Sequence, residues 1–308
     1  MKNYYRIMLG KKSVFAEECF AGNYIGANLS IQQDLSGNLP DEWREFNKKF
    51  IPVWLKGHPE KSKIAAGLAC GFLWTITKGI RKGDIVLCPD GTGSYRVGEI
   101  NGDYSYAPGK NLPHQRAVQW FNHPIDRSAM STALQHSAGS IGTVSDISRY
   151  QDELEKLLSG NSAPPLIAAD PDVEDPSAFA MEEHLEDFLV KNWPQTDLGK
   201  KYDIFEEEGE KVGQQYQTDT GPLDILAISK DRKELLIVEL KKGRASDVVV
   251  GQTLRYMGYV LEELAEEGQG VKGVIIALED DPKLQRALLA SPNISFYRYQ
   301  ISFKLLKS

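Results

Sequence analysis

Three charged residues lie in two strongly apolar segments of the C-terminal half: Asp224 in the first, Glu239 and Lys241 in the second. The two segments can form an antiparallel hairpin that turns at Asp231 and Arg232. Opposed residues of this hairpin include Asp224 and Glu239, whose Cβ atoms would lie roughly 5 Å apart. Because side chains on a strand alternate with a period of two, Lys241 shares the face of Glu239. The spacing therefore predicts two carboxylates and one ammonium in a single site.

Two carboxylates this close in a poorly solvated site repel each other unless a cation lies between them. Lys241 compensates only one of them, and the remaining charge suits Mg²⁺, which takes a few protein oxygens together with water and substrate phosphate. The carbonyl of Leu240 is a candidate for a further ligand, and Lys241 could orient or help deprotonate an attacking water. The ordinary alternative is that a Glu-x-Lys pair on a strand simply faces solvent.

The elements that must position these residues follow from the apolar patterning. The C-terminal half predicts, in order, a helix at 181–193, strands at 222–229 and 233–241, a helix at 247–266, a strand at 271–279, a helix at 282–290 and a terminal strand or hairpin at 294–306. This order indicates a mixed sheet flanked by helices. The helix that follows the hairpin carries Gln252, Arg255 and Tyr256 on one face.

The upstream helical glutamate, the G-x-x-D ending at Asp224, the E-x-K of Glu239 and Lys241, and the Gln-x-x-x-Tyr of Gln252 and Tyr256 resemble the PD-(D/E)XK, or restriction-endonuclease-like, superfamily. Within it, residues 181–270 are most similar to the C-terminal domain of archaeal and actinobacterial mismatch-specific endonucleases and to Mrr-like restriction nucleases. The resemblance implies a central mixed sheet and Mg²⁺-dependent phosphodiester hydrolysis, for which Mn²⁺ could substitute.

The resemblance also implies roles for single residues. Asp224 and Glu239 would bind metal, and Lys241 would assist the nucleophile. The helical acid that matches the family pattern is Glu182, which would hold a water on the ion or a second ion and so counts among the metal ligands; Glu186, one turn on, is the alternative. Gln252 is expected at the edge of the site, where its amide would position water or a scissile phosphate. For Glu182 and Gln252 the competing interpretation is an ordinary polar residue of a helix.

The N-terminal half predicts strands at 4–9, 84–88, 95–100 and 116–121, helices at 41–54 and 61–79, turns at 89–93 and 101–103, and a helix beginning at the capping box 143–146. Short strands joined by tight turns, with two helices, favour a small, partly closed β-barrel with helical insertions. The fold class is therefore α/β (α+β) with two domains. The segment 81–106 resembles the barrel core of PUA-like and EVE-like domains, some of which recognise modified bases.

This half carries no catalytic constellation, but it is mildly basic and rich in aromatic residues. Basic side chains contact phosphates, and aromatic faces can stack on an unpaired or flipped base. The residues expected to contact nucleic acid are Arg81, Lys82, Arg96 and Arg116 in the N-terminal half, and Arg255 and Tyr256 in the C-terminal half. The alternative is that the aromatic residues form the barrel core and the basic residues solvate it.

Composition supports two domains in a chain of 308 residues. The net charge of −7 is the sum of +5 in residues 1–150 and −12 in the remainder. The segment 161–178, with four prolines and four acidic residues, predicts a linker between a substrate-recognition domain at 1–160 and a nuclease domain at 179–308. Three widely spaced cysteines and the lack of a signal peptide or membrane span favour the cytoplasm.

Together these features predict a Mg²⁺-dependent DNA endonuclease that leaves 5′-phosphate, with modified or distorted DNA sensed by the N-terminal domain in restriction, defence or repair. Cutting both strands needs two sites, so a homodimer is expected. One alternative is a nuclease acting on branched or single-stranded DNA or on RNA. The other is a non-catalytic nucleic-acid-binding protein, against which the complete Asp/Glu/Lys set argues.

Overall fold

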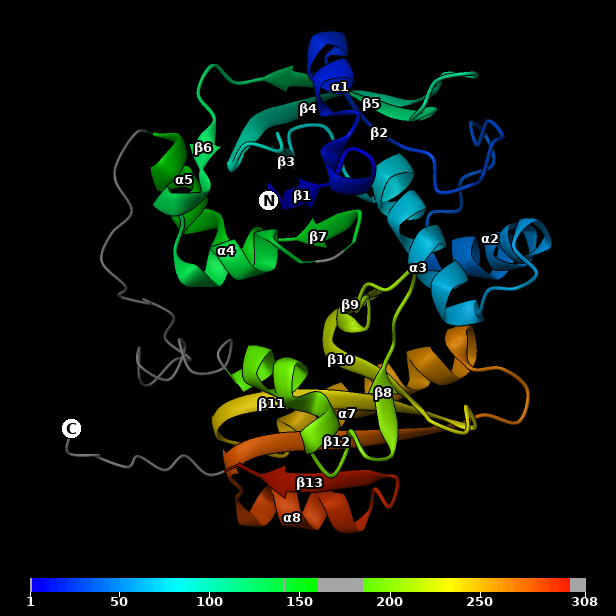
Figure 1. Cartoon of the computed structure of the whole chain (residues 1–308), viewed down its shortest axis with the longest axis vertical. Coiled ribbons are helices and arrows are strands. Elements are labelled where there is room, and N and C mark those ends of the chain that lie inside the picture. Colours follow the sequence, from blue (N-terminus) through cyan, green and yellow to red (C-terminus); the bar gives the residue numbers. More distant parts are fainter. Residues whose placement is uncertain (1, 141, 160–184, 300–308) are drawn as a thin grey trace. The chain divides into compact units, whose positions relative to one another are not determined.

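The computed structural model describes residues 2–140, 142–159 and 185–299. The chain divides into two compact units, Met1–Ile167 and Ala168–Ser308 (Figure 1). Each unit is built on one sheet with helices packed against it. The predicted mixed α/β class is confirmed.

The sheet of the first unit has the strand order β2-β5-β4-β3-β1-β7, with β6 paired to β4. Its strands are β1 (Tyr4–Ile7), β2 (Tyr24–Ala27), β3 (Ile85–Pro89), β4 (Ser94–Tyr106), β5 (His114–Trp120), β6 (Ile125–Asp126) and β7 (Val144–Asp146). Among the described residues no pairing joins β2 to β7, so the barrel is only partly closed, as predicted. Apolar side chains such as Ile7, Ile76 and Val86 form its core.

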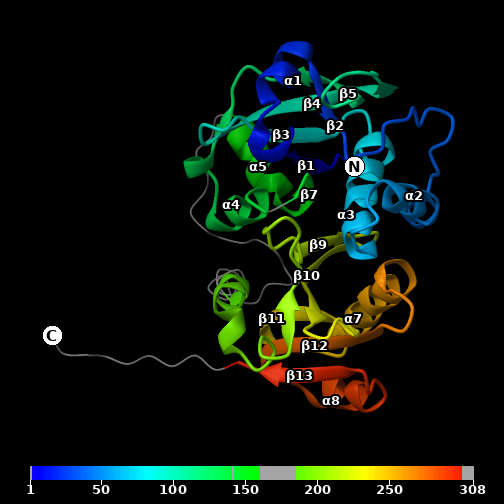
Figure 2. The same ribbon diagram turned by 45° about the vertical axis from the view of Figure 1, so that its right-hand side comes forward.

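Helices cover this sheet and connect its strands. They are α1 (Ala16–Gly22), α2 (Trp43–Gly57), α3 (Lys63–Trp74), α4 (Thr132–Ala138) and α5 (Gln151–Leu158), with short 3-10 turns at Lys11–Ser13, Arg127–Ala129 and Ser148–Tyr150. Figure 2 shows α2 and α3 side by side. Ser62 caps α3 by accepting a hydrogen bond from the Ala65 amide at 3.3 Å, and α3 runs on into a π-helical turn at Thr75–Gly79.

Two local patterns of this unit gave wrong predictions. The expected turn at 101–103 is a bulge inside β4, between Ile100 and Tyr104. A Cβ at Gly102 would lie 2.6 Å from the Cβ of Ala117, so glycine here permits close strand approach instead of reversing the chain. The capping box at 143–146 does not start a helix, because Val144–Asp146 pairs with β1 and α5 begins only at Gln151. Long-range strand pairing outweighs the local signal.

All three cysteines are free and buried in this unit. Burial raises the pKa of the Cys19 and Cys70 thiols to about 12 and holds the pKa of Cys88 well above its usual range. Since the thiolate is the reactive form, we expect no labelling of the native protein by a disulfide reagent at pH 8 and labelling of all three thiols in denaturant. Fast labelling of the native protein would contradict this.

The same shifts set the direction of alkaline destabilisation. The unfolded thiols lose their protons near their ordinary pKa of 9.0, whereas the folded Cys19 and Cys70 keep theirs until about pH 12. Unfolding therefore releases protons between these values, and the free energy of unfolding should fall as the pH rises through this window.

The second unit has a mixed six-stranded sheet in the order β13-β12-β11-β10-β8, with β9 paired to β10. The strands are β8 (Tyr202–Ile204), β9 (Gln214–Thr218), β10 (Gly221–Ser229), β11 (Glu234–Arg244), β12 (Gly270–Glu279) and β13 (Ile294–Arg298). The helices are a segment at 185–192, which a 3-10 turn at Trp193–Gln195 follows, α7 (Val248–Tyr259) with a π-helical turn at Val260–Leu264, and α8 (Pro282–Leu289). Strands β10 and β11 are antiparallel, whereas β11, β12 and β13 run parallel.

The β10–β11 hairpin has the predicted register. Ile225 pairs with Val238 and Ile228 with Leu235, so continuing the ladder by one residue brings Asp224 opposite Glu239. Four residues, 230–233, connect the strands. The predicted pairing of the two acidic residues therefore follows from the observed ladder.

The two faces of this sheet carry different side chains. Ile225, Val238 and Leu240 pack with Val190 and Trp193 in one core cluster. Alternation along the strands then turns Asp224, Glu239 and Lys241 toward the opposite face.

Helix α7 packs on that opposite face. A Cβ at Gly273 of β12 would lie 2.6 Å from Thr253 Cγ2 and 3.0 Å from Met257 Sδ, so the helix approaches the sheet closely at this glycine. Figure 2 shows α7 running beside β11 and β12. No helix in the described ranges is long and apolar enough to cross a membrane.

Candidate active site

Asp224 lies where the β10–β11 ladder ends. Its Oδ2 accepts a hydrogen bond from the Leu240 amide at 2.7 Å, and its Oδ1 accepts one from Gln215 Nε2 at 3.3 Å. In the first bond, the Leu240 amide donates to the Asp224 side chain instead of to a backbone carbonyl, and this fixes the carboxylate beside β11. Asp224 is therefore held in place from both neighbouring strands.

Glu239 and Lys241 lie on β11 with their charged groups together. Glu239 is 1% exposed, and Lys241 Nζ lies 3.9 Å from Glu239 Oε2. The Lys241 side chain keeps 33% of its surface exposed. The pair therefore combines a buried carboxylate with an ammonium group that solvent can reach.

Tyr256 and Gln252 face this site from α7. Burial, followed by the charges of Glu239 and Asp224, raises the pKa of Tyr256 to about 12, while a hydrogen bond from Gln252 opposes this shift. The Tyr256 hydroxyl donates to the carbonyl of Pro222 at 2.9 Å. Both carboxylates are thus close enough to act on the phenol, which stays protonated and holds the first residues of β10 against α7.

Glu186 is the alternative candidate for the helical acid. It is 6% exposed, and its carboxylate accepts hydrogen bonds from Gln214 Nε2 at 2.8 Å and from Gln215 Nε2 at 2.6 Å. Because Gln215 also reaches Asp224, one amide connects the helical carboxylate to the strand carboxylate. Glu182, the residue that the family pattern favours for this role, lies outside the described residues.

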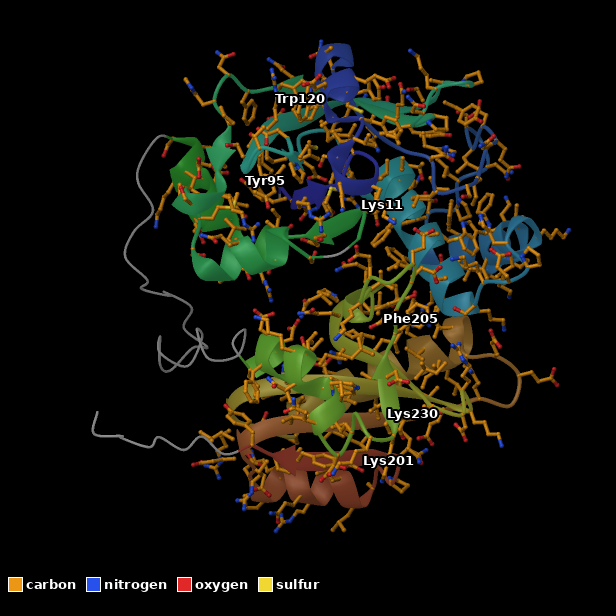
Figure 3. The ribbon with its side chains drawn as sticks, viewed as in Figure 1. Lys11, Tyr95, Trp120, Lys201, Phe205 and Lys230 are labelled. Atoms are coloured by element: carbon orange, nitrogen blue, oxygen red, sulfur yellow. The ribbon has the colours of Figure 1, made fainter. Side chains whose placement is uncertain are left out.

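The candidate site lies at one end of the sheet. Figure 3 labels Phe205 at one end of β8, and Lys201 and Lys230 at the other. The Phe205 amide bonds to the Leu226 carbonyl, and the Lys230 amide to the Lys201 carbonyl, both at 3.0 Å. Since Asp224 lies two residues before Leu226, the site belongs to the Phe205 end, away from the hairpin turn.

The donor set fits a hard divalent cation. Within the described part of the chain, no group of three or more His, Cys, Asp or Glu side chains could hold a metal ion by itself. Mg²⁺ does not need such a group, because it usually keeps several waters and takes one or two carboxylates. Asp224, Glu239 and the carbonyl of Leu240 offer that kind of set, whereas Glu186 contacts Asp224 through Gln215.

The residues expected to contact nucleic acid divide into two groups. Arg81, Lys82, Arg96 and Arg255 have exposed side chains, although Lys82 already pairs with Asp103 at 2.7 Å. Arg96 also lies over the ring of Phe20, with 5.3 Å between its Cζ and the ring centre. These four remain candidates for phosphate contacts.

The prediction is wrong for Arg116 and Tyr256. Arg116 is 4% exposed, and its guanidinium donates to the carbonyls of Ile80 at 2.7 Å and Gly102 at 3.1 Å. Tyr256 is 5% exposed, with its hydroxyl bonded to Pro222. Both side chains are committed to internal backbone groups and have no surface to offer a ligand.

Sequence reasoning missed Gln214 and Gln215. Their strand, β9, is short and polar, and its glutamines and threonines lack the apolar alternation that reveals a strand. The available signal was the run of glutamines just before Gly221 and Asp224.

Two family models match this chain. Residues 5–148 match a family described as a domain of unknown function (DUF8426), and residues 181–302 match the Endonuclease NucS C-terminal domain. Endonuclease NucS of Methanocaldococcus jannaschii is 32% identical over 96 residues, which are 31% of this chain and 35% of the relative. The matched region thus spans about a third of the length of this curated relative.

Two solved structures are similar to this chain at low sequence identity. The EndoMS–dsDNA2 complex has 12% identity and a TM-score of 0.32, covering 70% of this chain and 68% of that chain. A repair endonuclease from Pyrococcus abyssi has 14% identity and a TM-score of 0.31, covering 69% and 66%. The family match over 181–302 agrees with the motif built on Asp224, Glu239 and Lys241. Residues 181–302 of the C-terminal unit are therefore similar to the Endonuclease NucS C-terminal domain, and the Asp224, Glu239 and Lys241 motif lies within them.

Proposed function

We propose that this protein is a divalent-metal-dependent DNA endonuclease. The observation that carries the proposal is the arrangement of Asp224, Glu239 and Lys241 on one face of a hairpin, with Asp224 fixed by the Leu240 amide. The NucS-type domain, whose curated relative is named an endonuclease, supports the reaction class.

In this proposal Asp224, Glu239 and the Leu240 carbonyl hold Mg²⁺. The bound ion supplies Lewis acidity at the scissile phosphate. Lys241 orients the attacking water and balances the charge of Glu239, and Gln252 positions water or phosphate from α7. Attack at phosphorus with loss of the 3′ oxygen leaves a 5′-phosphate.

The N-terminal unit selects the DNA in this proposal. Phe20 and Trp120 make an edge-to-face pair with ring centres 5.1 Å apart, and the exposed Arg96 covers Phe20. Figure 3 labels Trp120 in this unit. An aromatic pair beside a cation suits contact with a distorted or modified base and its phosphate, as in repair, restriction or defence. Cutting both strands of a duplex requires two sites, which a homodimer provides.

The test is a cleavage panel with the full chain. Plasmid, mismatched, modified and branched duplexes, single-stranded DNA and RNA are each incubated with Mg²⁺, with Mn²⁺, or with a chelator. We expect metal-dependent cleavage of at least one duplex and none in chelator, because the two carboxylates would lack their counter-ion. Cleavage of RNA or single-stranded DNA alone would show that the substrate is not a duplex. Binding without cleavage of any substrate would refute the proposal that the protein is an enzyme.

A further inference from the structure

The amide of Gln215 connects two carboxylates of the candidate site. Its Nε2 lies 2.6 Å from Glu186 Oε2 and 3.3 Å from Asp224 Oδ1. Glu186 comes from the helix at 185–192 and Asp224 from β10, so this one side chain joins two residues that lie 38 positions apart in the sequence. Gln214 donates to the other oxygen of Glu186, which fixes the plane of that carboxylate.

The backbone at Gln215 has an unusual conformation. Its φ is +51°, in the left-handed region that residues with a long side chain rarely adopt. In a regular strand, Gln214 and Gln215 would point to opposite faces. The positive φ interrupts this alternation, and both amides reach the same carboxylate. A costly conformation that brings a polar group to a site is typical of functional positions.

The hydrogen bonds leave Asp224 with one defined orientation. Its Oδ2 is held by the Leu240 amide at 2.7 Å and its Oδ1 by Gln215, so rotation about χ2 would break both bonds. A carboxylate oxygen has two lone pairs, and each oxygen of Asp224 can keep its hydrogen bond while it binds an ion. The amide therefore need not leave when a cation arrives.

We propose that Gln215 is a positioning residue that preorganises Asp224 for the divalent cation, with Glu186 as its anchor. This inference rests on the proposed function, because it assumes that Asp224 binds the ion. Glu186 acts through Gln215, in agreement with the lack of a group of three acidic ligands among the described residues. Outer partners of metal ligands typically change ion affinity about 10–100-fold when they are removed.

The test measures Mn²⁺ binding by titration calorimetry on the full chain without DNA. Gln215→Met keeps the length of the side chain but removes the amide, and we expect it to weaken Mn²⁺ binding about tenfold or more. Gln269→Met is the matched control, because it removes the same amide at the hairpin turn, where Gln269 donates to the Arg232 carbonyl at 2.7 Å. Its affinity should stay within about twofold of the wild type.

A second variant guards against a folding defect. Gln215→Asn suits a positive φ but has an amide one methylene shorter, so it should weaken Mn²⁺ binding while the thermal midpoint in chelator stays near the wild-type value. Unchanged or tighter binding by both Gln215 variants would overturn the positioning role. Absence of Mn²⁺ binding by the wild type would instead overturn the proposed function, so the two failures are distinguishable.

Discussion

Asp224→Asn should reduce the rate of DNA cleavage by at least about 10³-fold, the consequence of losing several kcal/mol of metal-ion assistance. Asparagine retains an oxygen that can accept the Leu240 amide, so the β10–β11 ladder should persist. What disappears is the negative charge that the cation needs. The measurement is single-turnover cleavage of the substrate that the panel identifies, at saturating Mg²⁺.

Asp203→Asn provides the control for this variant. Asp203 lies on β8 of the same sheet, has an exposed side chain, and pairs through its backbone with Ile228. The substitution makes the same change of charge away from the site and should leave the cleavage rate within about twofold. If Asp224→Asn cleaved at the wild-type rate, the assignment of the site would be wrong.

Arg116→Met should lower the free energy of unfolding of the N-terminal unit by about 3 kcal/mol, since several buried carbonyls lose their donor at once. The guanidinium donates to Ile80 at 2.7 Å, Gly102 at 3.1 Å and Ile76 at 3.4 Å, and so satisfies carbonyls where the helix formed by α3 and its π-helical turn ends. Methionine fills the apolar part of the space but offers no hydrogen. We expect the thermal midpoint to fall by about 10 °C.

Arg96→Met is the matched control, on the neighbouring strand β4 with an exposed side chain. Its stability should change by less than about 0.5 kcal/mol. In DNA binding we expect the reverse: the surface variant changes the salt dependence and the buried one does not. Arg96→Met should lower the slope of log K against log salt by about one if Arg96 contacts a phosphate. Arg116→Met should leave this slope unchanged. A stable Arg116→Met protein with a lower salt slope would restore the surface role that the burial of Arg116 contradicts.

The central hairpin could be predicted because local rules determine it. The two apolar segments are separated only around Asp231 and Arg232, so the turn must lie there. The position of the turn and the alternation of side chains then determine which residues face each other. The apolar patterning also predicted the helix that follows the hairpin and the mixed sheet, both of which the structure has. The parallel pairing of β11 with β12, and of β12 with β13, agrees with the helix that connects each pair of strands.

Other features depend on contacts that no short segment encodes. The contact between Glu186 and Asp224 requires β9, and the position of its glutamines depends on a positive φ at Gln215, a conformation with no sequence signature in a glutamine. Arg116 lies on β5, and an arginine on a strand usually faces solvent. It is buried here because the turn that follows α3 packs against β5 and supplies carbonyl acceptors. β7 forms because β1 offers it an edge, against the local capping pattern.

Gly273 lies outside the candidate site but influences its dimensions. Because this position lacks a methyl group, Thr253 and Met257 rest directly on β12, and the same helix carries Gln252 and Tyr256 toward the acidic pair. A bulkier residue would push α7 away from β12 and so move Gln252 and Tyr256 relative to Asp224 and Glu239. The lack of a side chain at Gly273 therefore sets the distance between α7 and the strands that carry the acidic pair.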